Sequence, residues 1–205
     1  MMVNTLQAAV LAIAPIVRTG RLFGRLAFVY LTFMLCAFVS QAQTQDSSSA
    51  LTPERGVKAA YLYKFAGYID WPEGTFARGD TPITIAIMGD DQLADALAQY
   101  VSGRTVNNRP LTVKKQTGDD LPDGIHILFI ARSETARLRA TGRLMRPTLI
   151  VTESESTLTQ GSTINFLVSD GRVRFEVSLE NAEKRRLKLS SGLLRVAQNI
   201  RSATP

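Results

Sequence analysis

The chain has 205 residues, 45% of them hydrophobic, and its formal net charge at pH 7 is +6. Three of its 24 lysines and arginines lie within the first 25 residues, whereas all 18 acidic residues lie beyond residue 42. The rest of the chain therefore carries a net charge of only +3, which gives no reason to expect a nucleic-acid partner, and its length suits one domain with a full core.

Residues 1–42 have the pattern of a secretory signal peptide. The uncharged run at 26–39 follows three arginines and precedes the small residues Ser40 and Ala42, at positions that a signal peptidase recognises. A helix over this run would span about 21 Å, less than the ~30 Å hydrocarbon core of a bilayer. This length disfavours the alternative, an uncleaved membrane anchor, and we expect cleavage after Ala42.

The only cysteine, Cys36, lies inside this apolar run. Lipoprotein signals carry small residues just before their cysteine, whereas residues 33–35 are Phe-Met-Leu, so lipidation is not expected. Removal of the signal peptide would leave a domain without a thiol. Such a domain has no disulfide, no thiolate metal ligand and no cysteine nucleophile.

A polar leader at 43–52 separates the signal peptide from a single domain expected at 53–205. Thr52 and Pro53 predict the start of a helix, as its N-cap and first helical residue, and the helix is expected to extend to residue 69. Its predicted apolar face consists of Val57, Ala60, Tyr61, Phe65, Tyr68 and Ile69.

Beyond this helix, strand patterns alternate with helical periodicity. Continuous apolar runs predict strands at 82–89 and 124–131. A shorter strand is expected at 109–115, after the turn signal Asn107-Asn108, and another at 147–153. Helical spacing predicts helices at 90–101 and 133–145, the second capped by Ser133, and a short helix at 154–160.

The C-terminal part predicts a hairpin and a last helix. Strands at 162–170 and 172–179 flank Asp170-Gly171, a strong turn signal, and an amphipathic helix is expected at 189–201. Alternating strands and helices require parallel pairing with helices on the faces. The predicted fold is therefore α/β: a three-layer sandwich of helices around a mixed, mostly parallel sheet, with the C-terminal β-hairpin as antiparallel edge strands and a closing helix.

Gly89, Asp90 and Asp91 follow the first predicted strand, where open α/β sheets often bind phosphates. A phosphate-binding turn needs several glycines, and two carboxylates would repel an anion. We therefore expect Asp90 or Asp91 to cap the following helix.

Two further patterns are weighed as sites. His126 is the only histidine and lies within an apolar strand, which favours a buried, hydrogen-bonded side chain over a catalytic one. The acidic loop with Asp119, Asp120 and Asp123 lacks the spacing of a calcium-binding loop, so we expect a solvated turn. The sequence thus predicts no enzyme, no metal site and no cofactor.

Arg172, Arg174 and Glu176 alternate with apolar residues along the last predicted strand, so their side chains must share the face opposite the core. Such a face is usually solvated. On an edge strand it could also bind another protein.

Four segments, in collinear order over about 55–201, resemble the YfiR-like family of periplasmic proteins. They are "KAAYLYKFAGYIDWP", "ITIAIMGDD", "IHILFIARSE" and "RVRFEVSLENAEKRRLKLSSGLLRVAQNI". The resemblance implies a non-enzymatic, periplasmic α/β domain, often dimeric.

The resemblance also implies a function. It implies repression of an inner-membrane diguanylate cyclase through binding to the periplasmic region of the cyclase, which lowers cyclic-di-GMP synthesis and biofilm formation. Other relatives accompany outer-membrane receptors or sensor kinases. Some family members carry cysteines in the mature domain, and their absence here excludes redox control through a disulfide.

The stretch 57–72 contributes aromatic residues to the expected core and others to a candidate binding surface. Tyr61, Phe65 and Tyr68 are expected to pack on the sheet, whereas Tyr63 falls off the apolar stripe and Trp71 follows the helix. Exposed rings with a polar group are favoured at interfaces. The candidate partner-binding residues are therefore Tyr63, Trp71, Arg172, Arg174 and Glu176.

The alternative function is a small-ligand sensor or carrier. The carboxyl ends of parallel strands form natural clefts, which places a candidate cleft near 89–91 and 131–133. Its candidate residues are Gly89, Asp90, Asp91 and Ser133.

Overall fold

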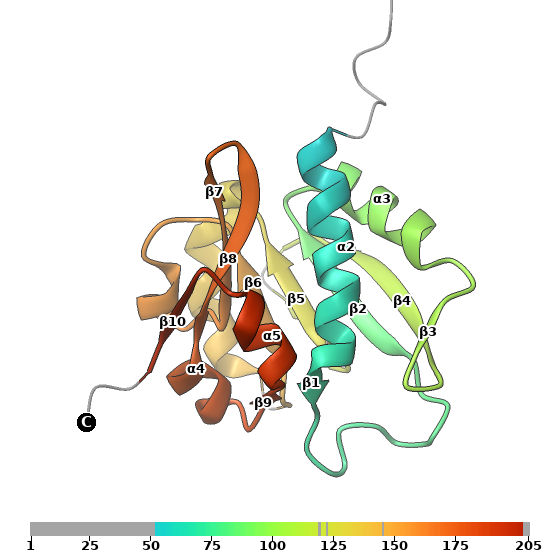
Figure 1. Ribbon diagram of the computed structural model, residues 1–205. Helices are drawn as coiled ribbons and strands as arrows, with labels where there is room; N and C mark the ends of the chain where they lie inside the picture. Colours follow the sequence, from blue (N-terminus) through green and yellow to red (C-terminus); the bar gives the residue numbers. More distant parts are fainter. Residues whose placement is uncertain (1–51, 119, 122, 145, 203–205) are drawn as a thin grey trace, which may run out of the picture. The chain divides into compact units, whose positions relative to one another are not determined.

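A computed structural model describes residues 52–202, except 119, 122 and 145 (Figure 1). The predicted signal peptide, its cleavage site, Cys36, nearly all of the leader and Asp119 lie outside the described residues. Within the described part of the chain, no helix is long and apolar enough to cross a membrane.

The first described helix, α2, spans Pro53–Tyr68, close to the predicted bounds. Thr52 occupies the N-cap position, but its side chain makes no capping hydrogen bond. The predicted face is partly wrong, because Val57 and Tyr68 are 42% and 38% exposed. The residues that α2 buries are Lys58, Ala59, Leu62, Phe65 and Ala66.

The buried face of α2 differs from the predicted apolar face for a steric reason. Figure 1 shows α2 across one face of the sheet, with α3 on one side of it and α5 on the other. Small residues at Ala59 and Ala66 let neighbouring elements approach closely. Tyr61 and Tyr63 are instead only partly buried and pack against the border of the core.

The alternation of strands and helices is confirmed. The central strands are β2 (Ile83–Met88), β4 (Arg109–Gln116), β5 (Ile127–Ile130) and β6 (Leu149–Thr152), and α3 (Asp91–Val101) connects β2 to β4. The hairpin consists of β7 (Ile164–Ser169) and β8 (Arg172–Ser178). Short strands are β1 (Ile69–Asp70) and β3 (Thr105–Val106).

The eight-stranded sheet has the order β10-β8-β7-β6-β5-β2-β4-β3. Strands β4, β2, β5, β6 and β7 run parallel, whereas β8 is antiparallel to β7. Asp170 and Gly171 both have positive φ, as the predicted turn requires. The predicted fold class, a mixed and mostly parallel sheet between helices, is confirmed.

Adjacent residues of the central strands enter different cores, which produces the three layers. Ile85 and Ile87 join the core beneath α2 and α3, whereas Ala86 and Met88 face the other side. There they meet Leu138. Burial on both faces explains why these strands are continuously apolar.

The segment predicted as a helix at 133–145 is a 3₁₀ helix, η1, over Arg132–Arg143. Ala131 occupies its N-cap position and no side chain caps it, so the predicted role of Ser133 as a cap is wrong. Few apolar side chains in this segment reach the core, so packing gives an α-helix little stabilisation here. A second 3₁₀ helix, η2, spans Thr157–Gln160.

The C-terminal prediction needs the largest correction, because the closing helix at 189–201 is not continuous. The observed elements are α4 (Leu179–Lys184), β9 (Lys188–Leu189), α5 (Ser191–Val196) and β10 (Asn199–Arg201). Strand β10 pairs in parallel with β8. Strand β8 is therefore not the edge of the sheet, because β10 satisfies backbone groups that a helix would have left open.

Candidate functional site

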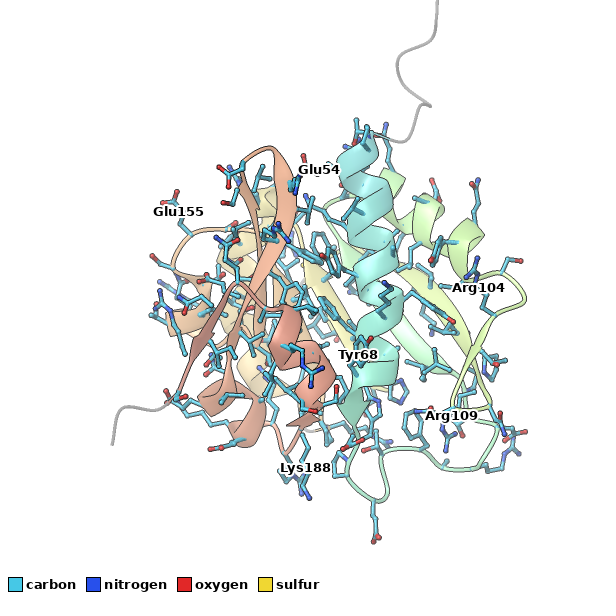
Figure 2. The ribbon with its side chains drawn as sticks, in the orientation of Figure 1. Glu54, Tyr68, Arg104, Arg109, Glu155 and Lys188 are labelled. Carbon is cyan, nitrogen blue, oxygen red and sulfur yellow. The ribbon has the colours of Figure 1, made fainter. Side chains whose placement is uncertain are left out.

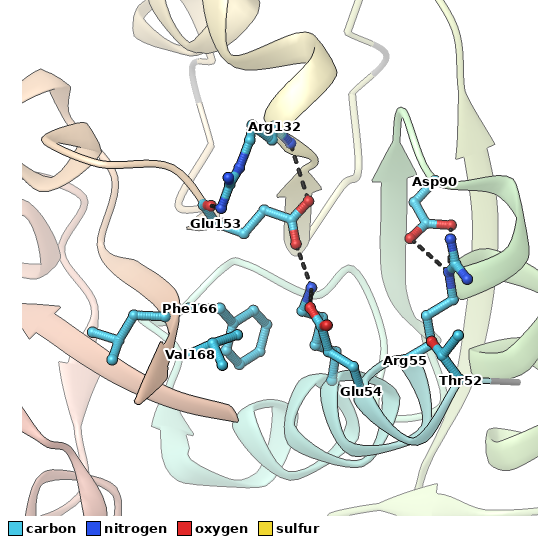
Figure 3. A pocket seen from close by; sticks show the side chains of 10 residues that line it. Thr52, Glu54, Arg55, Asp90, Arg132, Glu153, Phe166 and Val168 are labelled. Carbon is cyan, nitrogen blue, oxygen red and sulfur yellow. Dashed lines mark hydrogen bonds and ion pairs between the residues drawn. The ribbon is translucent and has the colours of Figure 1, made fainter. Parts of the chain in front are cut away.

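A pocket of about 560 Å³ lies between the first turns of α2 and the carboxyl ends of the parallel strands (Figure 3). In the strand order β6-β5-β2-β4, the chain continues from β2 to β4 in one direction across the sheet and from β5 to β6 in the opposite direction. Open α/β sheets bind ligands at such a point of reversal. The lining residues are Thr52, Glu54, Arg55, Lys58, Asp90, Arg132, Glu153, Phe166, Leu167 and Val168.

Lys58 lies at the centre of the polar side of the pocket. Its Nζ donates to Glu54 Oε1 and to Glu153 Oε2, each at 2.5 Å, and its side chain is only 9% exposed. Burial alone would lower the pKa of Lys58, but the hydrogen bonds to Glu153 and Glu54 outweigh it and raise the pKa above its ordinary value. Lys58 is therefore a fixed positive charge and not a base.

Glu153 connects this lysine to the loop that follows β5. Its Oε1 accepts a hydrogen bond from the backbone N–H of Arg132 at 3.1 Å, and its carbonyl accepts one from the Arg132 guanidinium at 3.3 Å. Figure 3 shows the Glu153 carboxylate with a dashed line to Arg132. Helix α2, the end of β5 and the end of β6 are thus joined through one carboxylate.

Asp90 has two functions at the end of β2. Its Oδ1 accepts a hydrogen bond from Leu93 N at 3.0 Å, which confirms the prediction that it caps the next helix. The same carboxylate accepts from Arg55 Nε at 3.1 and 3.2 Å. The capping residue therefore also fixes the first turn of α2.

The segment between β6 and β7 is fixed by buried hydroxyl groups. Thr152 Oγ1 lies 2.7 Å from Thr157 Oγ1, 2.8 Å from Ser162 Oγ and 2.9 Å from Asn165 Oδ1. These hydrogen bonds hold the ends of β6 and β7 together. They position Glu153 on one side of the pocket and Phe166 on the other.

The opposite wall of the pocket is apolar. Phe166 belongs to the core, whereas Val168, near the tip of the hairpin, is 60% exposed. The pocket thus combines an open apolar wall with a charged wall, in which Arg55 pairs with Asp90 and Lys58 pairs with Glu54 and Glu153. The third cation, Arg132, donates to the backbone carbonyl of Glu153. Such a pocket can bind an amphipathic group. The apolar part of the group would contact the apolar wall, and a charged part would replace one partner of an ion pair.

Only part of the predicted cleft lines this pocket. Asp90 does, but Gly89, Asp91 and Ser133 do not. Gly89 has a φ of +84°, and a Cβ there would lie 2.6 Å from Glu134 Cγ and 2.8 Å from Ser133 Oγ. The loops after β2 and β5 therefore pack closely on each other at Gly89.

The aromatic candidates lie at the border of the core. Tyr63 is half-buried, meets Tyr100 edge-to-face at 5.6 Å, and donates a 3.4 Å hydrogen bond to the Thr105 carbonyl. The Arg104 guanidinium lies 4.4 Å from the Tyr100 ring, on the side of the molecule that also carries Arg109 (Figure 2). Tyr63 therefore fixes the β3 hairpin through contacts within the chain.

Trp71 is half-buried at the amino ends of the strands. Its ring lies 6.1 Å from that of Phe76 and 5.8 Å from that of His126, and its Nε1–H is buried without a hydrogen-bond partner among the described residues. His126 is buried as predicted, and its Nδ1 accepts a 3.0 Å hydrogen bond from Thr84 N. Burial, helped by the charges of Arg109 and Arg146, lowers the pKa of His126 to about 4.

The charged ladder has the predicted orientation. Arg172 and Arg174 are exposed, and Glu176 accepts a 3.1 Å hydrogen bond from Asn165 Nδ2. Strand β10 pairs with β8 only over 176–178, so both arginines lie beyond this pairing. In the acidic loop, Asp120 and Asp123 are exposed, and the described residues include no cluster of potential metal ligands.

The fold and the pocket define an α/β domain with a mixed eight-stranded sheet, a small two-stranded sheet of β1 and β9, and a pocket at the carboxyl ends of the parallel strands. Residues 55–198 match the YfiR/HmsC-like family, so the chain belongs to this family. The resemblance inferred from the motifs is thereby confirmed. No curated protein matches the chain.

Proposed function

We propose that the domain is a non-enzymatic periplasmic regulator that binds the periplasmic region of a membrane signalling protein, a diguanylate cyclase, and represses it. The family match over 55–198 carries this proposal, because it extends over almost the whole described domain. Repression would lower cyclic-di-GMP synthesis and biofilm formation.

The hairpin offers a surface for such a partner. Near its tip, Val168 is exposed on the core side, while Arg172 and Arg174 are exposed on the opposite side. The tip of the hairpin thus presents an exposed apolar group on one face and cations on the other, and protein interfaces combine apolar and charged groups in this way. Contact at this surface needs no catalytic group.

Deletion of the gene tests the regulator directly. Cyclic-di-GMP, measured by mass spectrometry in extracts, is expected to rise on deletion and to return when the exported protein is restored. Chemical cross-linking in intact cells is expected to capture a membrane protein with a cytoplasmic diguanylate cyclase domain. Unchanged cyclic-di-GMP in growing and surface-attached cells, with no such cross-link, would contradict the proposal.

A second candidate function is a sensor for a small ligand, and the pocket beside Lys58 supports it. The two functions are compatible, since a ligand in this pocket would contact both α2 and the hairpin and so could release a partner. A thermal-shift screen tests it. A metabolite at 100 times its dissociation constant adds about 2.7 kcal/mol to the free energy of unfolding.

Two matched variants assign a hit to the pocket. Val168→Arg places a charge on its apolar wall, whereas Val57→Arg changes an exposed valine that does not line it. The ligand is expected to stabilise the second variant and not the first. Equal stabilisation of both variants would place the ligand elsewhere.

A further inference from the structure

Two small pockets adjoin at the amino ends of β6 and β7, at the opposite end of the sheet from the pocket of Figure 3. Their volumes are about 260 and 180 Å³, and both are lined by Arg146, Pro147 and Arg186. We call them together the basic double pocket. Each part has room for a phosphoryl group.

The charge of the basic double pocket is strongly one-sided. Arg146, Lys184, Arg185 and Arg186 line the larger part, and no carboxylate does; Glu73 lines the smaller part. Lys184 is paired with Glu180 at 2.5 Å. Among the described residues, none of the three arginines forms an ion pair with a carboxylate.

Arg185 is the most enclosed of these cations. Its guanidinium donates to Thr141 Oγ1 at 3.2 Å and to the Thr141 carbonyl at 3.5 Å, which are both neutral groups. Burial accordingly lowers the pKa of Arg185. An enclosed cation without a counter-ion is destabilised, and an anion in the adjoining pocket would relieve this destabilisation.

Arg186 is held in a left-handed backbone conformation, with φ +56°, just after α4. The turn is closed by hydrogen bonds from Arg186 N to Glu183 O and from Leu187 N to Ala182 O, at 2.8 and 2.9 Å. Glycine or asparagine is usual at such a position. An arginine here brings a cation to the boundary between the two parts of the double pocket.

Helix capping explains only part of this arrangement. Cations are favoured near the C-terminus of a helix, which accounts for Lys184 at the end of α4. Arg146 comes from a different segment, the one that precedes β6, and it still lines both parts of the double pocket. Cations from two separate segments therefore converge on one cavity.

We propose that the basic double pocket binds a phosphoryl group, either of free phosphate or pyrophosphate or of a phospholipid headgroup. The planar guanidinium matches the oxygens of a phosphoryl group in a bidentate manner, and three guanidinium groups without carboxylate partners supply that match. This site is independent of the proposed regulatory function, since it shares no residue with the hairpin surface or with the pocket beside Lys58.

The test compares two double variants with the same change of charge. Arg146→Gln/Arg186→Gln removes two exposed cations of the double pocket, whereas Lys114→Gln/Arg195→Gln removes two exposed cations from β4 and α5. Pyrophosphate is titrated into the exported domain by calorimetry at about 0.15 M salt, where exposed charges are largely screened. In parallel, the domain is sedimented with vesicles of phosphatidylglycerol or of phosphatidylcholine. Unfolding curves check that both variants are folded.

The wild type and the control variant are expected to bind equally, and the double-pocket variant at least tenfold more weakly. Pyrophosphate binding would assign the site to free phosphates. Sedimentation with phosphatidylglycerol alone, lost in the double-pocket variant, would assign it to a lipid headgroup. Binding to neither probe, or equal weakening in both variants, would overturn the proposal.

Discussion

Lys58 of α2 and Glu153 at the end of β6 form an enclosed ion pair, with 2.5 Å between Nζ and Oε2, although they are 95 positions apart. Lys58→Met is expected to reduce the free energy of unfolding by about 2–3 kcal/mol, because Glu153 loses a charged donor in a largely buried site. Urea unfolding followed by fluorescence measures this. The control Lys64→Met, at an exposed position of α2, should change stability by less than about 0.5 kcal/mol.

A double-mutant cycle separates the pair from its surroundings. Lys58→Met together with Glu153→Met should destabilise less than the sum of the single variants, by about 1–2 kcal/mol, because no buried charge is then left unpaired and Glu54 is half exposed. Simple additivity would show that the two side chains do not interact.

Asp90 and Asp91 are adjacent carboxylates with different roles. Asp90→Ala removes the cap of α3 and the partner of Arg55, and it is expected to cost about 1–2 kcal/mol of unfolding free energy. Asp91 is exposed and lies 3.9 Å from Lys115, so Asp91→Ala should cost less than about 0.5 kcal/mol. Thermal unfolding of both variants under one buffer condition tests this order, which equal costs would contradict.

Gly89 and Gly124 test the packing of the loops after β2 and β5. Both have positive φ, at +84° and +87°, but only at Gly89 would a Cβ collide with neighbouring side chains. Gly124→Ala is therefore expected to cost about 1–2 kcal/mol for the backbone alone. Gly89→Ala should cost at least about 1 kcal/mol more, through overpacking against Ser133 and Glu134. Equal costs in denaturant unfolding would mean that the loops separate easily.

His126 makes stability depend on pH. Its pKa in the folded protein is about 4, below the unfolded value near 6.5, so between these values the unfolded chain binds a proton that the folded domain does not. The free energy of unfolding is therefore unaffected by His126 above pH 6.5 and falls as pH decreases toward 4, by about 3 kcal/mol in total.

The variant His126→Asn isolates this effect, because its amide oxygen can still accept the hydrogen bond from Thr84 N. Urea unfolding at pH 7.5, 6, 5 and 4.5 should show a smaller loss of stability in the variant than in the wild type. Identical slopes would indicate that carboxylates alone cause the acid sensitivity.

The exposed arginines of β8 are predicted to affect binding without affecting folding. Arg172→Glu/Arg174→Glu should change the free energy of unfolding by less than about 1 kcal/mol, since neither side chain is buried. It should abolish cross-linking to the membrane partner and raise cyclic-di-GMP to the level of the deletion. The control Lys114→Glu/Arg195→Glu makes the same change of charge elsewhere, and equal effects of both variants would exclude a role for the hairpin.

The central strands β2, β5 and β6 could be predicted because they are continuous apolar runs, as in "ITIAIMGDD", and β7 and β8 because they flank the turn at Asp170-Gly171. The short strands β1, β3, β9 and β10 carry no such pattern and were not predicted. The face of α2 could not be predicted fully. Its periodicity is that of a helix, but packing decides whether Val57 or Leu62 enters the core. The C-terminal segment 189–201 has helical spacing, yet strand β10 forms there because β8 offers unpaired backbone groups, which is a tertiary effect.

The candidate site, too, could be predicted only in part from the sequence. Asp90 could be predicted from its place after a strand. The partners Lys58 and Glu153 could not be predicted, because nothing local to either residue indicates the other. A lysine among the apolar residues of α2 was the one available signal, since such a residue needs a counter-ion once it is buried.

Trp71 is the only tryptophan of the chain, and it follows the end of α2 that is remote from Lys58. A shift of its indole emission on occupation of the cavity beside Lys58 would therefore report a change transmitted from the carboxyl ends of the strands to their amino ends, where Trp71 packs on His126.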